Sequence, residues 1–444
     1  MIDPVAVTRE LLEKRAPGQW EVFHQISDTF KVEIKDGKVD SLHKARLSGL
    51  AVRVLTDGRL GFSYTSALDP AGLEETVRTA VSMAGHMEAD SDTDFAGPAL
   101  MPSLSGDIFE VALADFPEKD KREMAESIER TARRQDKRIT TVRKSGYADA
   151  VTTVRLVNSL GLDESAKAGF VRAWIELMAE ENGEQEMGFW MEQARLPHDI
   201  DVEAVGITAA RRALAGLGGR AVPSASIPVV MENTVAADLL RLLSHSFLGE
   251  NHFKDKASPR IRVGEKPFSE KVTILDDGLD ARGDEAFPFD GEGSPSCRTV
   301  VAQNGVVTSL LFDRYHARKF KTATTGNCRR GSFESLPAGG ITNLSMEPGL
   351  RTLKDIVGSI EQGLLVTDLM GLHTANPISG DFSVGASGFR IAHGKVDHPV
   401  KGVAVAGNLI DLFGKVVDVA DDFRYFGNVG AASFLVESLT ISGS

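Results

Sequence analysis

The chain has 444 residues, of which 42% are hydrophobic and 25% charged, a composition typical of a globular protein with two or three domains. Its 63 acidic residues outnumber its 50 basic ones, and the resulting net charge of −13 disfavours nucleic-acid binding. No segment is long and apolar enough to cross a membrane, and the amino-terminal residues do not resemble a secretory signal. A cytoplasmic protein is therefore expected.

Local signals place the first elements of the chain. Asp3 followed by Pro4 predicts the start of a helix, because aspartate caps helices and proline suits their first position. The pairs Asp36-Gly37 and Asp57-Gly58 separate alternating apolar and polar segments, which predicts antiparallel hairpins. Another aspartate-proline pair, Asp69-Pro70, predicts a second helix.

The middle of the chain continues this mixture of strands and helices. Long alternating segments between residues 141 and 195 predict strands, with a turn at Asn182-Gly183. An apolar periodic segment over 202–217 predicts a helix that ends at the glycines that follow it. These elements favour an α+β domain with antiparallel sheet over residues 1–220.

The second half, residues 221–444, is richer in glycine and in short apolar segments. We expect it to form a β-rich second domain that contains a helix over residues 234–248. The fold class expected for the whole chain is therefore α+β, with two domains built mainly from antiparallel sheets and flanking helices.

A possible metal site lies at the end of that predicted helix. Helical zinc sites place two histidines four residues apart, whereas His245 and His252 are seven apart, which is about 10.5 Å along a helix. Gly249 is expected to end the helix between them, so a loop could return His252 to His245, with Glu250 as ligand or base. The plain alternative is a set of polar residues at a helix end.

Catalysis by a cysteine is a second possibility. Cys297 and Cys328 lie in polar, loop-like segments, and a thiolate nucleophile would need a neighbouring histidine such as His316 or His373. The sequence does not place these residues relative to one another. A free cysteine is more often a small buried apolar residue.

Glycines and small polar residues are concentrated between residues 363 and 391. Glycine lets a backbone approach another group closely, so this segment could line a groove in which exposed backbone pairs with an extended peptide. Tightly turned β-structure, in which the glycines serve only the bends, explains the same pattern.

Several short motifs resemble the PmbA (TldE) branch of the TldD/PmbA metallopeptidase family. They occur in the same order and with similar spacing over essentially the whole chain. The motifs are Asn158-Ser159 with Gly161, Gly326-Asn327, Gly363 to Gly371, Ser379 to Ser383, Gly385 to Phe389, Ala406 to Asn408, and Ile441 to Gly443.

This resemblance implies an assembly of two kinds of chain. The TldD-type chain carries a His-Glu-x-x-x-His helix and a later cysteine that bind zinc, and the PmbA-type chain is its partner. Together they form a cytoplasmic metallopeptidase that cuts small or unfolded peptides. The family label "modulator of DNA gyrase" describes a phenotype and does not imply DNA binding.

The resemblance also indicates that the metal site has degenerated in this chain. Ser244, His245 and Gly249 stand at the positions of the first histidine, the glutamate and the second histidine. The segment 428–433 has alanine near the position of the cysteine. We therefore expect no catalytic residue and no cofactor in this chain, and zinc in a TldD-type partner.

Three functions follow as hypotheses. The leading one is a non-catalytic subunit of such a peptidase, in which Asp368, Gly380, Asp381 and Ser383 contribute to a peptide groove or subunit interface. The second is a self-sufficient hydrolase with a displaced site made by His245, Glu250 and His252. The third is a homodimer that binds peptides without cutting them.

Overall fold

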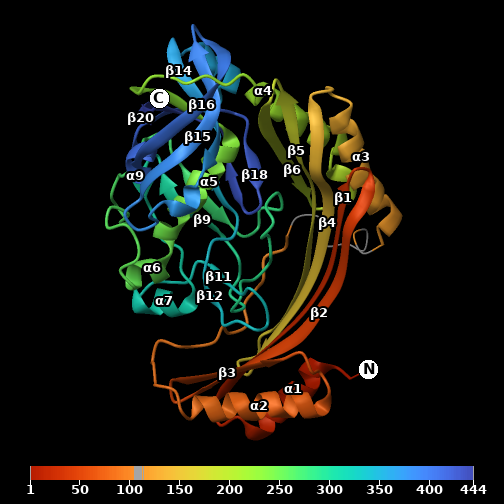
Figure 1. Ribbon diagram of the computed structural model, residues 1–444. Helices are drawn as coiled ribbons and strands as arrows, with labels where there is room; N and C mark the ends of the chain where they lie inside the picture. The colour runs from red at the N-terminus through yellow and green to blue at the C-terminus, as the bar shows by residue number, and fades with distance from the viewer. Residues whose placement is uncertain (1, 105–112, 114, 444) are drawn as a thin grey trace.

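The computed structural model describes residues 2–104, 113 and 115–443 (Figure 1). Its first helix, α1 (Pro4–Arg15), begins as the sequence predicted, because the Asp3 carboxylate accepts hydrogen bonds from the backbone N–H groups of Val5 and Ala6. The predicted hairpin turns are also present, since Asp36, Asp57 and the glycines that follow them all adopt positive φ.

The amino-terminal half forms one antiparallel sheet in the order β3-β2-β1-β4-β5-β6. Its strands are β1 (Gln19–Lys35), β2 (Lys38–Thr56), β3 (Arg59–Thr65), β4 (Ile139–Asn158), β5 (Asp163–Glu181) and β6 (Glu184–Ala194). Four of them are 17 to 20 residues long, so the sheet extends along much of the molecule (Figure 1).

Two separate pairs of helices cover this sheet. At one end, α1 and α2 (Pro70–Ala84) pack on β1, β2 and β3, and at the other α3 (Glu118–Arg133) and α4 (Val202–Gly216) pack on β4, β5 and β6 (Figure 1). Each pair has its own apolar core. The middle of the sheet is left to contact the carboxy-terminal half of the chain.

The carboxy-terminal half contains two further six-stranded sheets and a small two-stranded one. One has the order β16-β15-β14-β7-β20-β17, and an additional pairing joins β16 to β20. Its strands are β7 (Ala225–Met231), β14 (Gln362–Met370), β15 (Asp381–Ala392), β16 (Lys395–Asn408), β17 (Val416–Val419) and β20 (Phe434–Ser442).

The second sheet of this half has the order β10-β9-β8-β13-β19-β18, and β11 pairs with β12 beside it. The strands are β8 (Ile274–Asp277), β9 (Arg298–Gln303), β10 (Val306–Val307), β11 (Cys328–Arg329), β12 (Ala338–Gly339), β13 (Leu344–Met346), β18 (Arg424–Phe426) and β19 (Val429–Ala431). The short helices of the described chain include η1 (Pro197–Asp199), α7 (Arg314–Lys319), α8 (Leu353–Gly358), η3 (Leu372–Thr374) and α9 (Leu409–Gly414).

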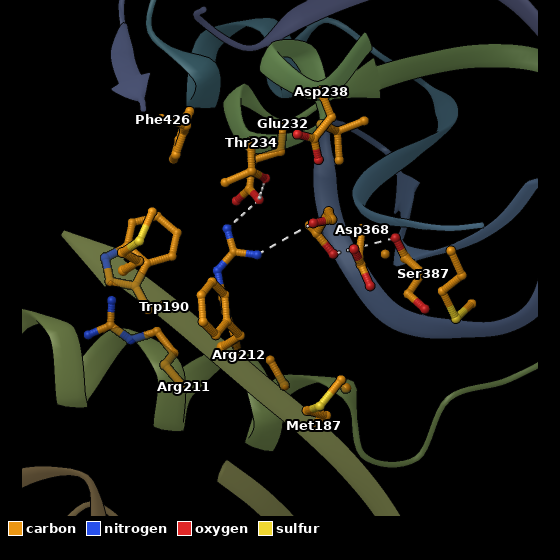
Figure 2. Close-up of a pocket in the computed structure, with 18 of the residues that line it drawn as sticks. Met187, Trp190, Arg211, Arg212, Glu232, Thr234, Asp238, Asp368, Ser387 and Phe426 are labelled. Carbon is orange, nitrogen blue, oxygen red and sulfur yellow. Dashed lines mark hydrogen bonds and ion pairs between the residues drawn. The ribbon is translucent and has the colours of Figure 1, made fainter. Parts of the chain in front are cut away.

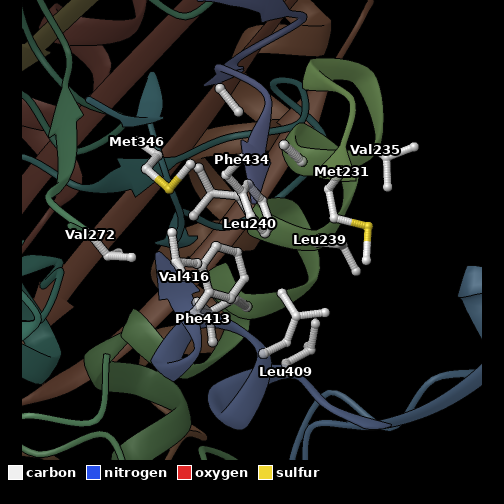
Figure 3. Packing of buried hydrophobic residues seen from close by; sticks show 14 of the residues in the cluster. Met231, Val235, Leu239, Leu240, Val272, Met346, Leu409, Phe413, Val416 and Phe434 are labelled. Carbon is white, nitrogen blue, oxygen red and sulfur yellow. The ribbon is translucent and has the colours of Figure 1, made fainter. Parts of the chain in front are cut away.

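The largest apolar core lies between these two sheets and surrounds helix α5 (Asn233–Leu243). Leu239 and Leu240 of α5 are fully buried, and the rings of Phe413 and Phe434 pack with centroids 5.5 Å apart (Figure 3). Burying a side chain of this size contributes about 1.5–3 kcal/mol. This core therefore fixes α5 rigidly in the protein.

The helix predicted over residues 234–248 is shorter than expected. It ends at Leu243 and is followed by a 3-10 turn, η2 (Ser244–Phe247), and by α6 (Gly249–Phe253). Gly249 begins this last helix and does not end one, which corrects the sequence-based expectation. Its N–H bonds to Leu311 O at 2.8 Å, and a Cβ here would lie 2.2 Å from the Phe312 ring, so tertiary contact redirects the chain.

The mixed sheet and helix architecture confirms the expected α+β class with mainly antiparallel pairing. Among the residues that the structure describes, none of the helices has both the length and the hydropathy needed to traverse a lipid bilayer.

Candidate functional site

A cavity of 1030 Å³ lies where the amino-terminal sheet meets the carboxy-terminal half (Figure 2). Its walls come from β6 and α4 on one side and from α5, β14 and β15 on the other. Ligand pockets in proteins commonly enclose about 300–1,000 Å³, so this cavity is large enough for an extended ligand.

Strand β6 supplies an open edge to the cavity. It is the last strand of its sheet, and β5 is its strand neighbour within the described residues. Gly188 packs so closely on α4 that a Cβ would lie 2.1 Å from Ala209 O. Side chains alternate along a strand, so Met187 and Phe189 point to the opposite face, where they are 58% and 51% exposed.

Helix α5 faces the cavity with a polar stripe. Thr234, Asp238 and Arg241 are spaced by four and three residues, which places them on one side of the helix. Arg241 donates to Asn428 Oδ1 at 3.0 Å and to Phe426 O at 2.8 Å, which joins the end of α5 to the turn between β18 and β19.

Most charges around the cavity are paired. Ion pairs join Arg172 to Asp284, Arg212 to Glu232, and Lys401 to Glu186. Arg212 also lies over the Trp190 ring, with its guanidinium carbon 4.8 Å from the ring centroid (Figure 2). These pairs fix the walls and leave little net charge on them.

Two carboxylates that face the cavity are exceptions. In the part of the chain that the structure describes, Asp238 and Asp368 have no lysine or arginine nitrogen within 4.0 Å. Desolvation by the surrounding protein raises the pKa of Asp238; Arg241 opposes this shift, and the charge of Asp368 adds to it. A positively charged group bound in the cavity would stabilise the ionised forms of Asp238 and Asp368.

Asp368 is the one groove candidate from the sequence that lines this cavity. A bulge in β14 between Val366 and Asp368 turns this part of the strand, and the carbonyl of Thr367 lies 3.5 Å from Arg212 Nη1. In the sequence, Asp368 lies within the motif Gly363 to Gly371, one of those that carry the family resemblance.

The other three groove candidates lie elsewhere, at the β15–β16 ladder. Asp381 accepts a hydrogen bond from Asn408 Nδ2 at 2.8 Å, Gly380 precedes it with a φ of 83°, and Ser383 pairs with Ala406. These residues form the turn and strand that hold Asn408 in place.

The positions that the resemblance assigns to the degenerate zinc helix also lie outside the cavity. Ser244 Oγ donates to Arg241 O at 2.6 Å, and His245 Nε2 lies 3.1 Å from Lys256 O. Gly249 lies against Phe312. Sequence reasoning missed Thr234, Asp238 and Arg241, although their spacing within an apolar helix was a usable signal.

The displaced site considered from sequence is not assembled in this structure. His252 Nε2 lies 2.8 Å from Ser246 O, and Glu250 pairs with Lys254 at 2.5 Å. His245 bonds to a different carbonyl, that of Lys256. The histidine that does approach Glu250 is His316.

The two cysteines are in contrasting places. Cys297 is exposed, and its Sγ lies 3.1 Å from Thr325 O. Cys328 is buried, and burial together with the charges of Glu292 and Asp290 raises the pKa of its thiol. Such an environment disfavours the thiolate that a nucleophile requires.

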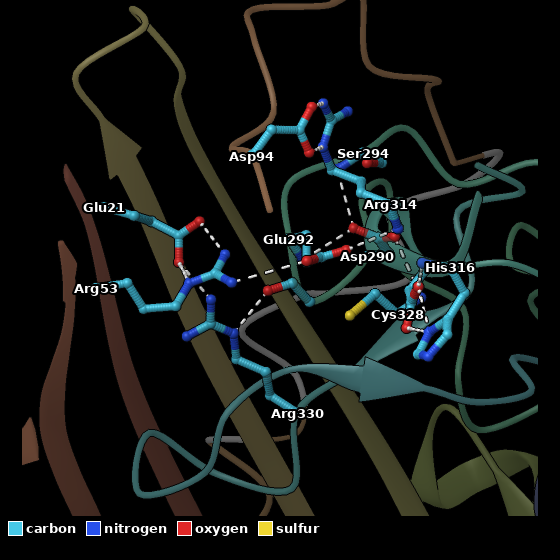
Figure 4. A network of polar contacts seen from close by, with 12 residues as sticks. Glu21, Arg53, Asp94, Asp290, Glu292, Ser294, Arg314, His316, Cys328 and Arg330 are labelled. Atoms are coloured by element: carbon cyan, nitrogen blue, oxygen red, sulfur yellow. Dashed lines mark hydrogen bonds and ion pairs between the residues drawn. The ribbon is translucent and has the colours of Figure 1, made fainter. Parts of the chain in front are cut away.

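Cys328 borders a second cavity of 450 Å³, which shares Arg172, Asp284 and Glu285 with the larger one. Beside it lies a buried polar network that joins the two halves of the chain (Figure 4). Arg53 donates to Glu21 at 2.9 and 2.7 Å, and Arg330 pairs with the same carboxylate.

The environment of this network shifts the pKa values of its acidic groups in opposite directions. Burial alone would raise the pKa of Glu21, but Arg53 and Arg330 outweigh it and hold that pKa below its usual value. Desolvation raises the pKa of Asp290, and the neighbouring Glu292 raises it further. The network therefore holds one firmly ionised carboxylate and, close by, a pair of acids that resist ionisation.

Comparison with known proteins identifies the family. Models of the PmbA/TldA metallopeptidase domain 1, central domain and C-terminal domain match residues 20–84, 112–217 and 224–443. Metalloprotease PmbA of Escherichia coli O157:H7 is 26% identical over 454 residues, covering 100% of this chain and 98% of that protein. A metalloprotease TldD homolog of Haemophilus influenzae is 28% identical over 90% of this chain and 85% of its own length.

Solved structures agree with this assignment. A protein of Thermotoga maritima described as a modulator of DNA gyrase superposes with a TM-score of 0.90 at 27% identity, over 99% of this chain and 100% of that chain. TldE from Thermococcus kodakarensis has the same fold, with a TM-score of 0.91 at 22% identity over 99% and 100% of the two chains. The chain belongs to the PmbA/TldD metallopeptidase family, which confirms its resemblance to the PmbA (TldE) branch.

Proposed function

We propose that this chain is the PmbA/TldE-type subunit of a cytoplasmic zinc metallopeptidase that acts on small or unfolded peptides, and that it lacks the catalytic zinc itself. The observation that carries this proposal is the composition of the large cavity. None of the described residues that line it is a histidine or a cysteine, the residue types that the resemblance gives for the zinc ligands of a TldD-type chain. Without a metal-activated water, the hydrolytic step belongs to the partner.

The walls of the cavity favour peptide as the ligand. β6 is the edge strand of its sheet and lines the cavity, and an extended peptide can add to such an edge as a further strand. Met187 and Phe189 provide apolar contact beside it, and the opposite wall provides Asp238 and Asp368. Backbone pairing is independent of peptide sequence, which suits a protein that acts on varied unfolded peptides.

The proposal is tested by reconstitution. The purified chain, the TldD-type chain of the same genome, and a mixture of the two are assayed with a pool of quenched fluorescent peptides. We expect no cleavage by this chain alone and cleavage by the mixture at a rate above that of the TldD-type chain alone. As a control, a TldD-type chain with glutamine in place of its motif glutamate should abolish cleavage in the mixture.

Cleavage by this chain alone would overturn the proposal and favour a self-sufficient hydrolase. In that case a variant tests the site formed by His245, Glu250 and His252. His252→Asn should remove the activity if His252 acts in this site. Peptide binding without cleavage, and no gain from the TldD-type chain, would instead indicate a homodimeric peptide-binding protein. Size-exclusion chromatography of each mixture distinguishes a homodimer from a mixed assembly.

A further inference from the structure

A group of potential metal ligands lies outside both cavities, where α6 and α7 contact each other (Figure 1). Glu250, Asp313 and His316 each present one ligand atom, and these atoms lie within 4.8 Å of one another. Asp313 and His316 are only 5% and 6% exposed. Two carboxylates and an imidazole therefore converge in a largely buried place.

Asp313 and His316 already have the separation of two ligands of one ion. His316 Nδ1 lies 2.8 Å from both carboxylate oxygens of Asp313, and Asp313 is held in place because it caps α7 by accepting the His316 N–H at 2.7 Å. Ligands bound at about 2.0–2.2 Å to one zinc ion lie roughly 3 Å apart. Glu250, whose ligand atom lies within 4.8 Å of those of Asp313 and His316, would complete a three-ligand site.

The space between the two carboxylates is not filled by a side chain from the adjoining strand. Gly339 of β12 faces them, and a Cβ at this position would lie 3.4 Å from both Asp313 Oδ2 and Glu250 Oε2. Glycine is therefore the residue that leaves room beside these two oxygens.

Lys254 is the cation now nearest to Glu250, with its Nζ 2.5 Å from Oε1. Its side chain is 48% exposed, so it can turn into solvent at little cost. An ion bound beside Glu250 would compete with this lysine for the same carboxylate.

We propose that Glu250, Asp313 and His316 bind one divalent cation of the zinc type, which favours mixed nitrogen and oxygen ligands. The site is distinct from the positions that the resemblance assigns to a catalytic zinc, and it goes beyond the proposed function.

The bound ion would stabilise the contact between the two halves of the chain. Helix α7 carries Arg314 and Tyr315, which bind Asp94 and Asp90 of the segment that follows α2. Linking α7 to α6 through a metal fixes the helix from which these contacts are made. The role we assign to the ion is therefore structural.

The experiment uses the full-length chain, stripped with a chelator and titrated with zinc alone by calorimetry, with bound metal counted after dialysis. We expect one zinc per chain and a rise in the midpoint of thermal unfolding. Glu250→Gln and His316→Asn should each weaken zinc binding by at least about tenfold. His316→Asn retains the backbone N–H that Asp313 accepts, so that the helix cap is preserved.

Two further variants sharpen the test. Lys254→Gln removes the competing cation and should tighten zinc binding several-fold, and this exposed change leaves the fold intact. His252→Asn, a neighbouring histidine outside the group, should have no effect. Absence of saturable zinc binding, equal affinity in Glu250→Gln and the unmodified chain, or loss of binding in His252→Asn would overturn the proposal. None of these outcomes depends on peptidase activity, so failure of the zinc-site proposal can be told apart from failure of the proposed function.

Discussion

Glu21 and Arg330 are 309 positions apart in the chain and form a buried ion pair. Glu21 belongs to β1 of the amino-terminal sheet, whereas Arg330 directly follows β11 in the other half. Arg53 of β2 binds the same carboxylate and also lies 3.7 Å from Glu292 (Figure 4). The two halves of the chain are thus joined through one carboxylate that is sealed from solvent.

Replacing this carboxylate should destabilise the protein strongly. Glu21→Gln would leave Arg53 and Arg330 buried without their counter-charge, and we expect the free energy of unfolding to fall by about 3–5 kcal/mol. Urea unfolding followed by circular dichroism measures the change. The matched control is Glu13→Gln in the exposed pair with Arg9, which should cost less than about 1 kcal/mol. Similar effects of the two changes would contradict the role assigned to Glu21.

Asp276 should make stability depend on pH in the mildly acidic range. It is 1% exposed, and desolvation raises the pKa of its carboxyl from 3.8 to about 6, although Thr342 and Asn327 donate hydrogen bonds to it. A raised pKa in the folded state stabilises the protein fully below pH 4, and this contribution is lost as the pH rises through 6. The difference corresponds to roughly 3 kcal/mol.

The measurement is the free energy of unfolding between pH 4 and pH 7 for the unmodified chain and for Asp276→Asn. Asparagine cannot ionise, so the decline in stability over this range should be smaller in the variant. Asp40→Asn, an exposed change on β2, should leave the pH profile unaltered. Parallel profiles for all three proteins would rule out the assigned contribution of Asp276.

Gly188 should be intolerant of even one added methyl group. A Cβ would lie 2.1 Å from Ala209 O on α4, so Gly188→Ala must push β6 away from the helix. We expect a loss of about 1–3 kcal/mol in the free energy of unfolding and weaker peptide binding, because β6 forms one wall of the cavity. Gly97→Ala, where nothing lies within 4 Å of the added Cβ, is the control and should change neither quantity.

The two carboxylates on α5 and β14 should favour basic peptides. Asp238→Asn and Asp368→Asn each remove a negative charge from the cavity wall, and each should weaken binding of a lysine- or arginine-containing peptide by about 1 kcal/mol. Binding of a neutral peptide of the same length should change little. Fluorescence anisotropy at low and high salt measures both, and the difference should shrink at high salt. Glu88→Gln, exposed and outside the cavity, is the control, and an equal loss there would refute a local effect.

Local signals in the sequence were sufficient for many elements. The aspartate caps of α1 and α2, and the aspartate-glycine turns after β1 and β2, depend only on neighbouring residues and appear where they were expected. The helix after β7 was predicted too long: it ends at Leu243, and the chain starts a new helix at Gly249, which contacts Phe312 and Leu311. That contact joins residues more than sixty positions apart, which no local pattern reports.

The candidate sites show the same difference between local sequence signals and contacts of residues far apart in the chain. The motifs of the sequence were sufficient to indicate the family, and of the four groove candidates Asp368 lines the large cavity. The histidine that meets Glu250 is His316, which comes from α7, and not His245 or His252 nearby in the chain.

By itself, therefore, the sequence determined the α+β class, the family, the starts of α1 and α2 and the hairpin turns after β1 and β2, because these depend on short-range backbone preferences and on ordered motifs. Only the tertiary structure decided the cavity walls, the Glu21–Arg330 pair and the group formed by Glu250, Asp313 and His316. Those features arise where segments distant in the chain pack together, and the packing of buried side chains depends on the complete fold.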